Sequence, residues 1–422
     1  MRAAFAQRRF RILFGGIVAS QLGDSVMLLV LSIWVKNLTG SNAAAGFTFF
    51  WLVLPSLAAP LLGWGVDKVA RRTFLVVGNL ASALVLLPLF LVHDSRHVWV
   101  IYAVAVGYGI SFVTLPAALN GMLKHLLPDD QLIDANAAIA TTREGLRLGG
   151  PLLGAGLYTA FGPSVVVSID IVSFLVAAAA VLALRVDTDV VEVSTLAWKD
   201  EVLAGIRHIG RDRVLKHSLI AIGIAICVIG FTESCIYAVL DAFHKTASFV
   251  GVISTVQGVG AVLAGLMTSR LVKRRGEVSV MLAGLLICTV GLAIMVAAKS
   301  IFMVLASVFV FGLALPPIII GLTTLMQVRT PQALMGRVSA AFDVILGTPQ
   351  SLSIAVGALM VSVVSFRVIF AIMAGAFALS AIYLRFSVGG RDRGLPPPRV
   401  PATAESVSPV HEPLMPDGPL PG

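Results

Sequence analysis

Long apolar runs separated by short polar segments are the dominant pattern of this chain. A helix that crosses the hydrocarbon core of a bilayer needs about 20 mostly apolar residues. Runs of that size cover residues 12–35, 43–66, 73–92, 98–123, 137–161 and 164–184, and then 217–240, 247–271, 278–298, 301–326, 337–362 and 367–386. The pattern predicts an all-α polytopic membrane protein with twelve transmembrane helices.

Composition supports lipid as the solvent of this chain. Its 422 residues are 58% hydrophobic and 13% charged, with a mean hydropathy of +0.95. Soluble domains carry about 45–50% apolar and about 25% charged residues. The first apolar run is longer than the core of a signal peptide, so we expect it to remain as the first span.

The basic residues are unevenly distributed over the connections between the runs. Most of the 31 lysines and arginines fall in alternate segments, namely 2–11, 68–72, 124, 185–216, 270–275, 329–337 and 385–399. The opposite segments hold only Lys36, Arg96, Lys245, Lys299 and Arg367. The positive-inside rule therefore predicts that both termini are cytoplasmic, and we expect a protein of the plasma membrane, which in a bacterium is the inner membrane. Because the positive charges form no continuous stripe, the net charge of +9 does not indicate nucleic-acid binding.

Two polar segments divide the chain. The longest interval between runs predicts a cytoplasmic linker over 185–216, between a bundle of six helices in 1–184 and another in 217–388. The segment 389–422 is rich in proline and cannot bury enough apolar surface to fold alone, so we expect a disordered cytoplasmic tail.

An internal repeat relates the two halves. The connection after the second run carries a glycine, a small polar or acidic residue and three bases, and the connection after the eighth run repeats this order 202 residues later (63 to 265, 68 to 270). The first copy is Gly63, Asp67, Lys68, Arg71 and Arg72, and the second is Gly265, Ser269, Arg270, Lys273 and Arg274. The repeat predicts two pseudo-symmetric six-helix bundles around a substrate cavity.

The first copy resembles motif A of the major facilitator superfamily, and Gly150-Pro151 followed by Gly154 resembles the core of its antiporter motif. Ser20 to Asp24 and Thr142-Arg143-Glu144 are most similar to the drug:proton antiporters typified by macrolide-efflux and enterobactin-export proteins. The resemblance implies the major facilitator fold and alternating access. It also implies that Asp67, with Arg71 and Arg72, latches a cytoplasmic gate in the outward-facing state.

Ionisable side chains at membrane depth are costly and are therefore functional candidates. Asp24 lies about twelve residues into the first span, near the midplane, where a carboxyl group can take up a proton and yield it to a cationic substrate. Glu233, Asp170 and Asp343 are further candidates for proton coupling or substrate binding. The alternative for Asp24 is a carboxylate held by nearby hydroxyls such as Ser20 or Ser25 purely for packing.

The fifth span has both charges and small residues. Arg143, Glu144 and Arg147 lie on neighbouring helical turns close to the cytoplasmic end. They either act in a gate or in substrate binding, or they reach for the membrane interface. Gly150 and Gly154 around Pro151 predict a bend and close packing against another helix.

These features favour a transporter over an enzyme. No phosphate-binding glycine loop is present, and Asp129, Asp130 and Asp134 lack the second acidic cluster that a metal-dependent prenyl transferase needs, so we expect neither a cofactor nor a metal. We expect a monomer that exports small amphiphilic molecules of the drug or antibiotic type by proton antiport, with the substrate, protons and membrane lipids as its partners. A siderophore or lysophospholipid transporter of the same fold, and a membrane-embedded enzyme or a non-transporting sensor, are the alternatives.

Overall fold

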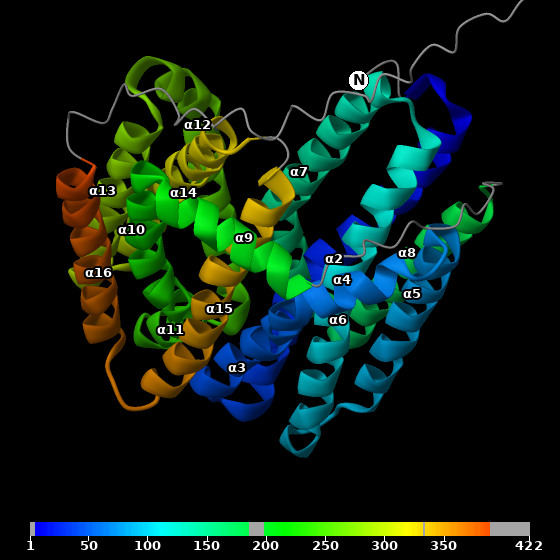
Figure 1. Ribbon diagram of the computed structural model, residues 1–422. Coiled ribbons are helices and arrows are strands. Elements are labelled where there is room, and N and C mark those ends of the chain that lie inside the picture. The colour runs from blue at the N-terminus through cyan, green and yellow to red at the C-terminus, as the bar shows by residue number, and fades with distance from the viewer. Residues whose placement is uncertain (1–4, 185–197, 332–333, 389–422) are drawn as a thin grey trace, which may run out of the picture.

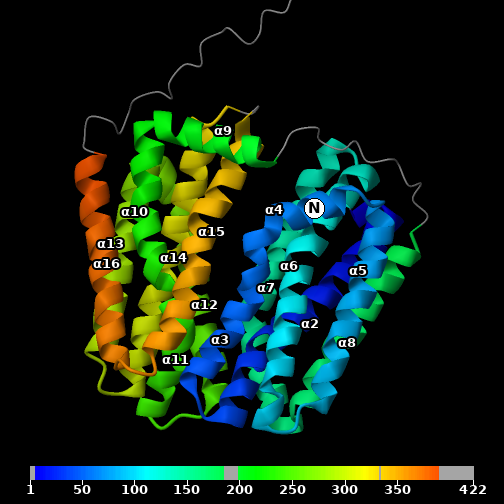
Figure 2. The same ribbon diagram turned by 60° about the horizontal axis from the view of Figure 1, so that its bottom comes forward.

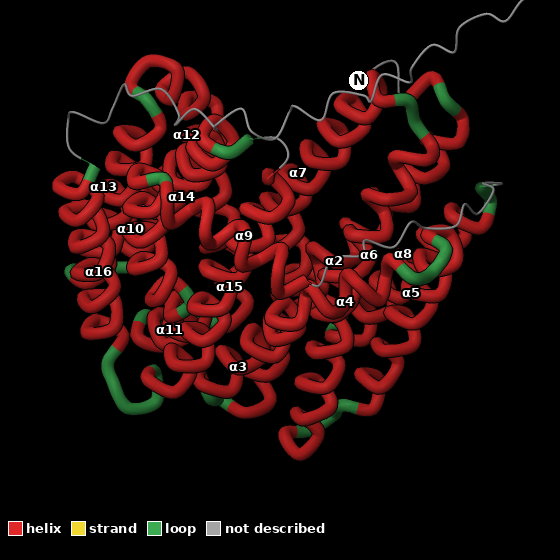
Figure 3. Tube along the Cα trace, viewed as in Figure 1, coloured by secondary structure: helices red, strands yellow, loops and turns green. Residues whose placement is uncertain are grey.

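The computed structural model describes residues 5–184, 198–331 and 334–388, and every regular element in these ranges is a helix (Figure 3). The expected tail 389–422 and the first part of the expected linker, 185–197, lie outside the described residues. Each apolar run predicted to span the membrane coincides with one helix or with consecutive helices, which confirms the all-helical fold class.

The first half contains α2 (Arg8–Thr39), α3 (Asn42–Val53), η1 (Leu54–Ala58), α4 (Ala59–Asp67), α5 (Arg71–Leu86), η2 (Leu87–Leu91), η3 (Ser95–His97), α6 (Val98–Leu126), α7 (Asp129–Phe161) and α8 (Pro163–Leu182). After α9 (Trp198–Arg211), the second half contains α10 (Arg213–Ile229), α11 (Phe231–Ala242), η4 (Ala247–Phe249), α12 (Val250–Arg275), α13 (Glu277–Val296), α14 (Ile301–Arg329), α15 (Met335–Met360) and α16 (Phe366–Ser387).

Ten helical segments of the described chain are long and apolar enough to cross a membrane. The second predicted span is broken into α3, η1 and α4, because Pro55 has no N–H to donate to the preceding turn. The fifth predicted span lies in α7, a helix of 33 residues whose charged side chains lower its hydropathy. The large apolar side chains exposed on the outer helices, such as Leu84 and Phe386, suit contact with lipid.

The helices pack as two bundles that lie side by side (Figure 1). In the first, α2 packs against α7 and α8, and α5 packs against α6 and α8. In the second, α14 packs against α12 and α13, and α16 packs against α10 and α13. This arrangement confirms the predicted fold of two six-helix bundles.

The two bundles differ in how their cores are built. One continuous cluster of buried apolar side chains runs through the second bundle from Val214 to Val388, and it extends into the first bundle at Leu29, Ile33, Ala45, Phe49 and Ala155. The first bundle has two clusters, one near Phe10 and Leu123 at the end that bears the N-terminus, and one near Val30 and Ile101 at the opposite end. A layer of polar side chains separates these two clusters at mid-depth, and it contains the candidate functional site.

The bundles meet at one end and diverge at the other. Inter-bundle packing joins α7 to α12 and α3 to α11 and α15. Toward the end that carries the N-terminus and α9, the helices of the two bundles separate (Figures 1 and 2). At that end α9 packs across α15, where Gly205 lies directly against the backbone of Arg337.

Candidate functional site

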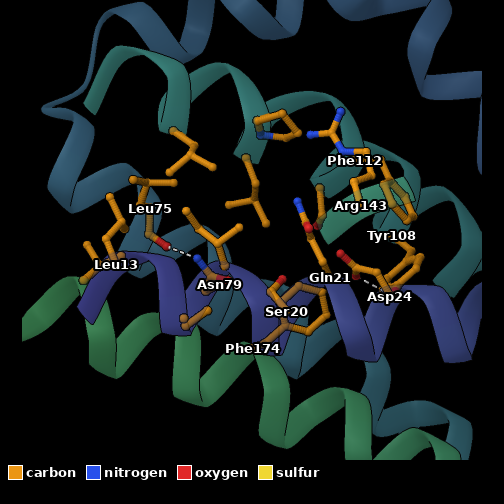
Figure 4. Close-up of a pocket in the computed structure, with 18 residues that line it drawn as sticks. Leu13, Ser20, Gln21, Asp24, Leu75, Asn79, Tyr108, Phe112, Arg143 and Phe174 are labelled. Carbon is orange, nitrogen blue, oxygen red and sulfur yellow. Dashed lines mark hydrogen bonds between the residues drawn. The ribbon is translucent and has the colours of Figure 1, made fainter. Parts of the chain in front are cut away.

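A cavity lies between the two core clusters of the first bundle (Figure 4). Its walls come from α2, α5, α6, α7 and α8, and they are mostly apolar, with Phe112, Leu115 and Phe174 among them. The polar groups that line it are Ser20, Gln21, Asp24, Asn79, Tyr108, Ser111 and Arg143. The cavity that contains Asp24 is therefore formed by one bundle, whereas the repeat predicted a cavity between both.

A buried tyrosine connects two of the predicted acids. The hydroxyl oxygen of Tyr108 lies 2.7 Å from Oδ1 of Asp24 and 2.8 Å from Oδ2 of Asp170. Tyr108 and Asp170 are 1% and 0% exposed, whereas Asp24 faces the cavity. These side chains come from α6, α2 and α8, so the three helices are fastened together at this depth.

The glycine before Asp24 makes this contact possible. A methyl group at Gly23 would overlap Oδ1 of Asp170 and Oγ of Ser173, so only glycine lets α8 approach α2 this closely. Ser173 donates a hydrogen bond to the backbone oxygen of Asp170 at 2.7 Å and lies 3.2 Å from its Oδ1. Asp24 is held through Tyr108, which the sequence did not single out, and Ser25 instead donates to the carbonyl of Leu22.

The other two predicted acids lie elsewhere. Glu233 is in the first turn of α11 in the second bundle and does not line the cavity. Arg147 lies 3.9 Å from Glu144 on its own helix, and both side chains are exposed. Asp343 is exposed on α15 and does not line the cavity. The structure thus brings together Asp24 and Asp170 alone among the four acids.

The motif around Pro151 in α7 packs against two neighbouring helices. Side chains added at Gly150 and Gly154 would overlap Ser25 and the carbonyl of Val26, so this face of α7 packs tightly on α2. The carbonyl of Pro151 lies against Gly251 of α12 in the other bundle. Arg143, nearer the N-terminus of α7, contributes to the cavity wall.

The first copy of the repeated motif lies at the end where the bundles diverge. Asp67 is the last residue of α4, and its side chain is outside the described part of the chain. Lys68 is exposed, the side chain of Arg71 covers Gly121 of α6, and Arg72 donates to the carbonyl of Leu182 at 2.9 Å. A methyl group at Gly63 would meet nothing within 4 Å, so no other helix lies against Gly63 while the bundles are apart.

The second copy has a different local structure. Here α12 continues through Arg270, Lys273 and Arg274, which are exposed, and ends at Arg275. Gly276 stops the helix with φ of +78°, a conformation that favours glycine. Gly265, like its counterpart in the first half, has no close neighbour.

Polar contacts join the bundles at their opposite end. Nζ of Lys36 donates to Oδ2 of Asp241 at 2.6 Å, and the hydroxyls of Ser32 and Tyr237 are 2.5 Å apart. The two residues of each pair are 205 positions apart, which is close to the 202-residue offset of the repeat. Each pair therefore joins nearly equivalent positions of the two halves, as expected near a pseudo-twofold axis. No pattern in the sequence indicated that these residues pair.

Within the described residues, no group of three or more His, Cys, Asp or Glu side chains could hold a metal ion. Apolar helices long enough to cross a membrane, packed as two bundles with a partly charged cavity in one of them, are typical of multi-pass membrane transporters of small molecules. The chain belongs to the Major Facilitator Superfamily, whose family model matches residues 13–347 and 222–416. The predicted family, and the choice of a transporter over an enzyme, are confirmed.

Individual relatives are distant. The chain is similar to the uncharacterized MFS-type transporter YfiS of Bacillus subtilis (strain 168), with 24% identity over 63% of this chain and 64% of that protein, somewhat less than two thirds of its length. It is also similar to macrolide efflux protein A of Streptococcus pyogenes, with 18% identity over 85% of this chain and 90% of the relative. The crystal structure of a mutant of the nucleoside transporter NupG has the same fold, with a TM-score of 0.73 and 14% identity over 91% of this chain and 100% of that structure.

Proposed function

We propose that this protein is a secondary active exporter that exchanges small amphiphilic cations for protons, with Asp24 as the group that binds each in turn. The observation that carries the proposal is the placement of the Asp24 carboxyl group in a mostly apolar cavity. Apolar walls favour the hydrophobic part of an amphiphile, and a carboxylate favours its positive charge. A proton and a cation compete for the same oxygen atoms, which couples their movements.

The charges around the cavity agree with a cationic ligand. Arg143 also lines the wall, but its guanidinium group lies apart from the carboxylate of Asp24 (Figure 4). The layer between the core clusters is otherwise lined by neutral polar groups such as Asn79 and Gln21. The name of the macrolide efflux relative supports export of a drug-like molecule.

The two ends of the molecule support alternating access. Lys36 with Asp241, and Ser32 with Tyr237, hold the bundles together at one end, while the bundles diverge at the other. The distribution of lysine and arginine supports a cytoplasmic location for the divergent end. The arrangement is then inward-facing, as an exporter needs when it collects its substrate, with both termini in the cytoplasm of a bacterium.

The first copy of the repeated motif acts in the outward-facing state. When the divergent ends close, α4 and α5 approach the second bundle, and the carboxyl group of Asp67 with the bases Arg71 and Arg72 latches the gate. The present separation at Gly63 agrees with an open latch. We take the transporting unit to be a monomer, because one chain supplies both bundles and the cavity.

Transport into everted membrane vesicles tests this function. Ethidium serves as an amphiphilic monovalent cation, and respiration supplies a proton gradient. The wild-type protein should accumulate ethidium in a gradient-dependent way, Asp24→Asn should abolish accumulation, and Asp343→Asn, which removes an exposed carboxyl group outside the cavity, should retain it. Full gradient-driven accumulation by Asp24→Asn would contradict the proposal. Ethidium uptake by the wild-type protein that does not depend on the proton gradient would instead identify a facilitator.

A further inference from the structure

We propose that Asp170 keeps a resident proton in this conformation and that the hydroxyl of Tyr108 relays its effect, so that Asp24 alone presents negative charge to the cavity. Asp170 is then a positioning residue, and the exchanged proton belongs to Asp24. The ligand class, a monovalent organic cation, rests on the proposed function. The protonation of Asp170 does not.

The number of hydrogens available to three neighbouring oxygen atoms shows that one of the two carboxyl groups is protonated. Three oxygen atoms stand in a row, from Asp170 Oδ2 to Tyr108 Oη to Asp24 Oδ1, with separations of 2.8 and 2.7 Å. A tyrosine hydroxyl has one hydrogen to donate, and an ionised carboxylate has none. One of the two contacts therefore needs a hydrogen from a carboxylic acid, and the trio of Asp24, Tyr108 and Asp170 holds one proton beyond that of the phenol.

Burial decides which acid carries the proton. Asp170 is 0% exposed and is surrounded by Tyr108, Ser173 and the backbone at Gly23. An ion in such a place loses its hydration without gaining a cation. Asp24 faces the cavity, where water or a positive ligand can reach it. The carboxylic acid of Asp170 therefore donates a hydrogen bond to Tyr108, and the hydroxyl of Tyr108 donates one to the carboxylate of Asp24.

The neighbouring helices add no charge that reverses this order. Of the cavity-lining residues, α7 contributes Arg143, α5 contributes neutral Asn79, and α6 contributes Tyr108 and Ser111. Glu233 lies on α11 in the other bundle and does not line the cavity. Asp24 is then the one acidic group of the cavity wall that carries negative charge, and it lies apart from the cation Arg143 (Figure 4). A single carboxylate fits a ligand with a single positive charge.

Infrared spectroscopy tests the location of the proton directly. The full-length protein is labelled with aspartate carrying ¹³C in its carboxyl group, placed in lipid nanodiscs and studied at about pH 7.5, where aspartates in water are ionised. The labelled C=O band of a protonated carboxyl group should be present in the wild type and in Asp24→Asn, and absent in Asp170→Asn. A band that disappears in Asp24→Asn and persists in Asp170→Asn would overturn the proposal, as would the absence of any band in the wild type.

Cation affinity tests the relay. Ethidium binding should weaken about 10- to 100-fold in Asp24→Asn, the range expected when a charge-assisted contact is lost. Asp170→Leu removes the donor to Tyr108 and should weaken binding about tenfold. Asp170→Asn restores a neutral donor and should bind more tightly than Asp170→Leu, and equal weakening by both variants would contradict the relay.

The two proposals fail separately. If the band is assigned to Asp170 but transport does not depend on the proton gradient, the proposal that Asp170 is protonated holds and the proposal of proton antiport is wrong. If Asp24→Asn abolishes gradient-driven transport but the band belongs to Asp24, the proposal of proton antiport holds and the proposal that Asp170 is protonated is wrong. Should Asp170→Leu fail to fold, the labelled band in the wild type and in Asp24→Asn still decides the question.

Discussion

Removing the ion pair between Lys36 and Asp241 should shift the protein toward an outward-open state. The pair joins α2 to α11 at the end where the bundles meet, and it exists only while that end is closed. The side chain of Lys36 is 10% exposed and that of Asp241 is 48% exposed. Lys36 also donates to the carbonyl of Gly40 at 2.9 Å, so it keeps one partner when Asp241 is changed.

The size of the shift follows from this partial burial. Exposed ion pairs contribute about 0.2–1 kcal/mol, and hydrogen bonds to charged groups about 1.5–3 kcal/mol. A pair with one shielded and one half-exposed partner falls between these ranges, at about 1–1.5 kcal/mol. Since about 1.4 kcal/mol corresponds to a tenfold change, Asp241→Asn should raise the ratio of outward-open to inward-open molecules about five- to tenfold.

Distances between spin labels measure this ratio. Labels are placed at Phe161→Cys and Val363→Cys, one on each bundle at the closed end, after the three native cysteines have been replaced by serine. Asp94→Asn is the matched control, because Asp94 contacts His97 within one exposed loop of the first bundle. The longer distance should gain population in Asp241→Asn and not in Asp94→Asn.

The charge-reversed double variant Lys36→Asp with Asp241→Lys should recover most of the wild-type distribution, because the attraction is restored with its partners exchanged. An unchanged distribution in Asp241→Asn would refute the assignment of this pair to the closed end of a gate.

Three further outcomes are expected. Gly23→Ala should weaken ethidium binding at least about tenfold, because its methyl group displaces Asp170, whereas Gly15→Ala on the same helix, with no neighbour within 4 Å, should bind normally; equal effects would contradict the close approach. Arg329→Met should lower the free energy of unfolding by about 3–5 kcal/mol, measured by thermal unfolding in detergent, because Asp212 is 2% exposed and loses the partner 3.1 Å away; a loss below about 1 kcal/mol would show that the pair contributes little. Exchange of one proton for one monovalent cation moves no net charge, so collapsing the membrane potential should leave ethidium transport in proteoliposomes unchanged, while collapsing the pH gradient should stop it; dependence on the potential would indicate a different stoichiometry.

The spans could be predicted because bilayer thickness fixes the length of an apolar run, which is a local property of the sequence. The break of the second span at Pro55 and the continuation of α12 through the second motif were not anticipated. Local sequence signals were present in both cases, namely the proline and Gly276, but hydropathy averages over a whole crossing and does not register them.

The site could be predicted only in part. Asp24 was identifiable because a charge inside an apolar run is costly, and the same argument included Asp170 with less emphasis. Tyr108 was missed, since a tyrosine in an apolar helix is indistinguishable from an aromatic residue that fills the core. Its role depends on α2, α6 and α8 meeting at one depth, and helical periodicity within a single span carries no information about that meeting.

Proton release on substrate binding tests the central claim most directly. Purified wild-type protein in a weakly buffered detergent solution with a pH-sensitive dye, at a pH low enough for Asp24 to be protonated, should release protons when ethidium is added, up to about one proton for each cation bound, because both compete for the carboxyl group of Asp24. Asp24→Asn should release none at ethidium concentrations high enough to saturate it. Release of as many protons by Asp24→Asn as by the wild type would show that another group couples the proton to the substrate.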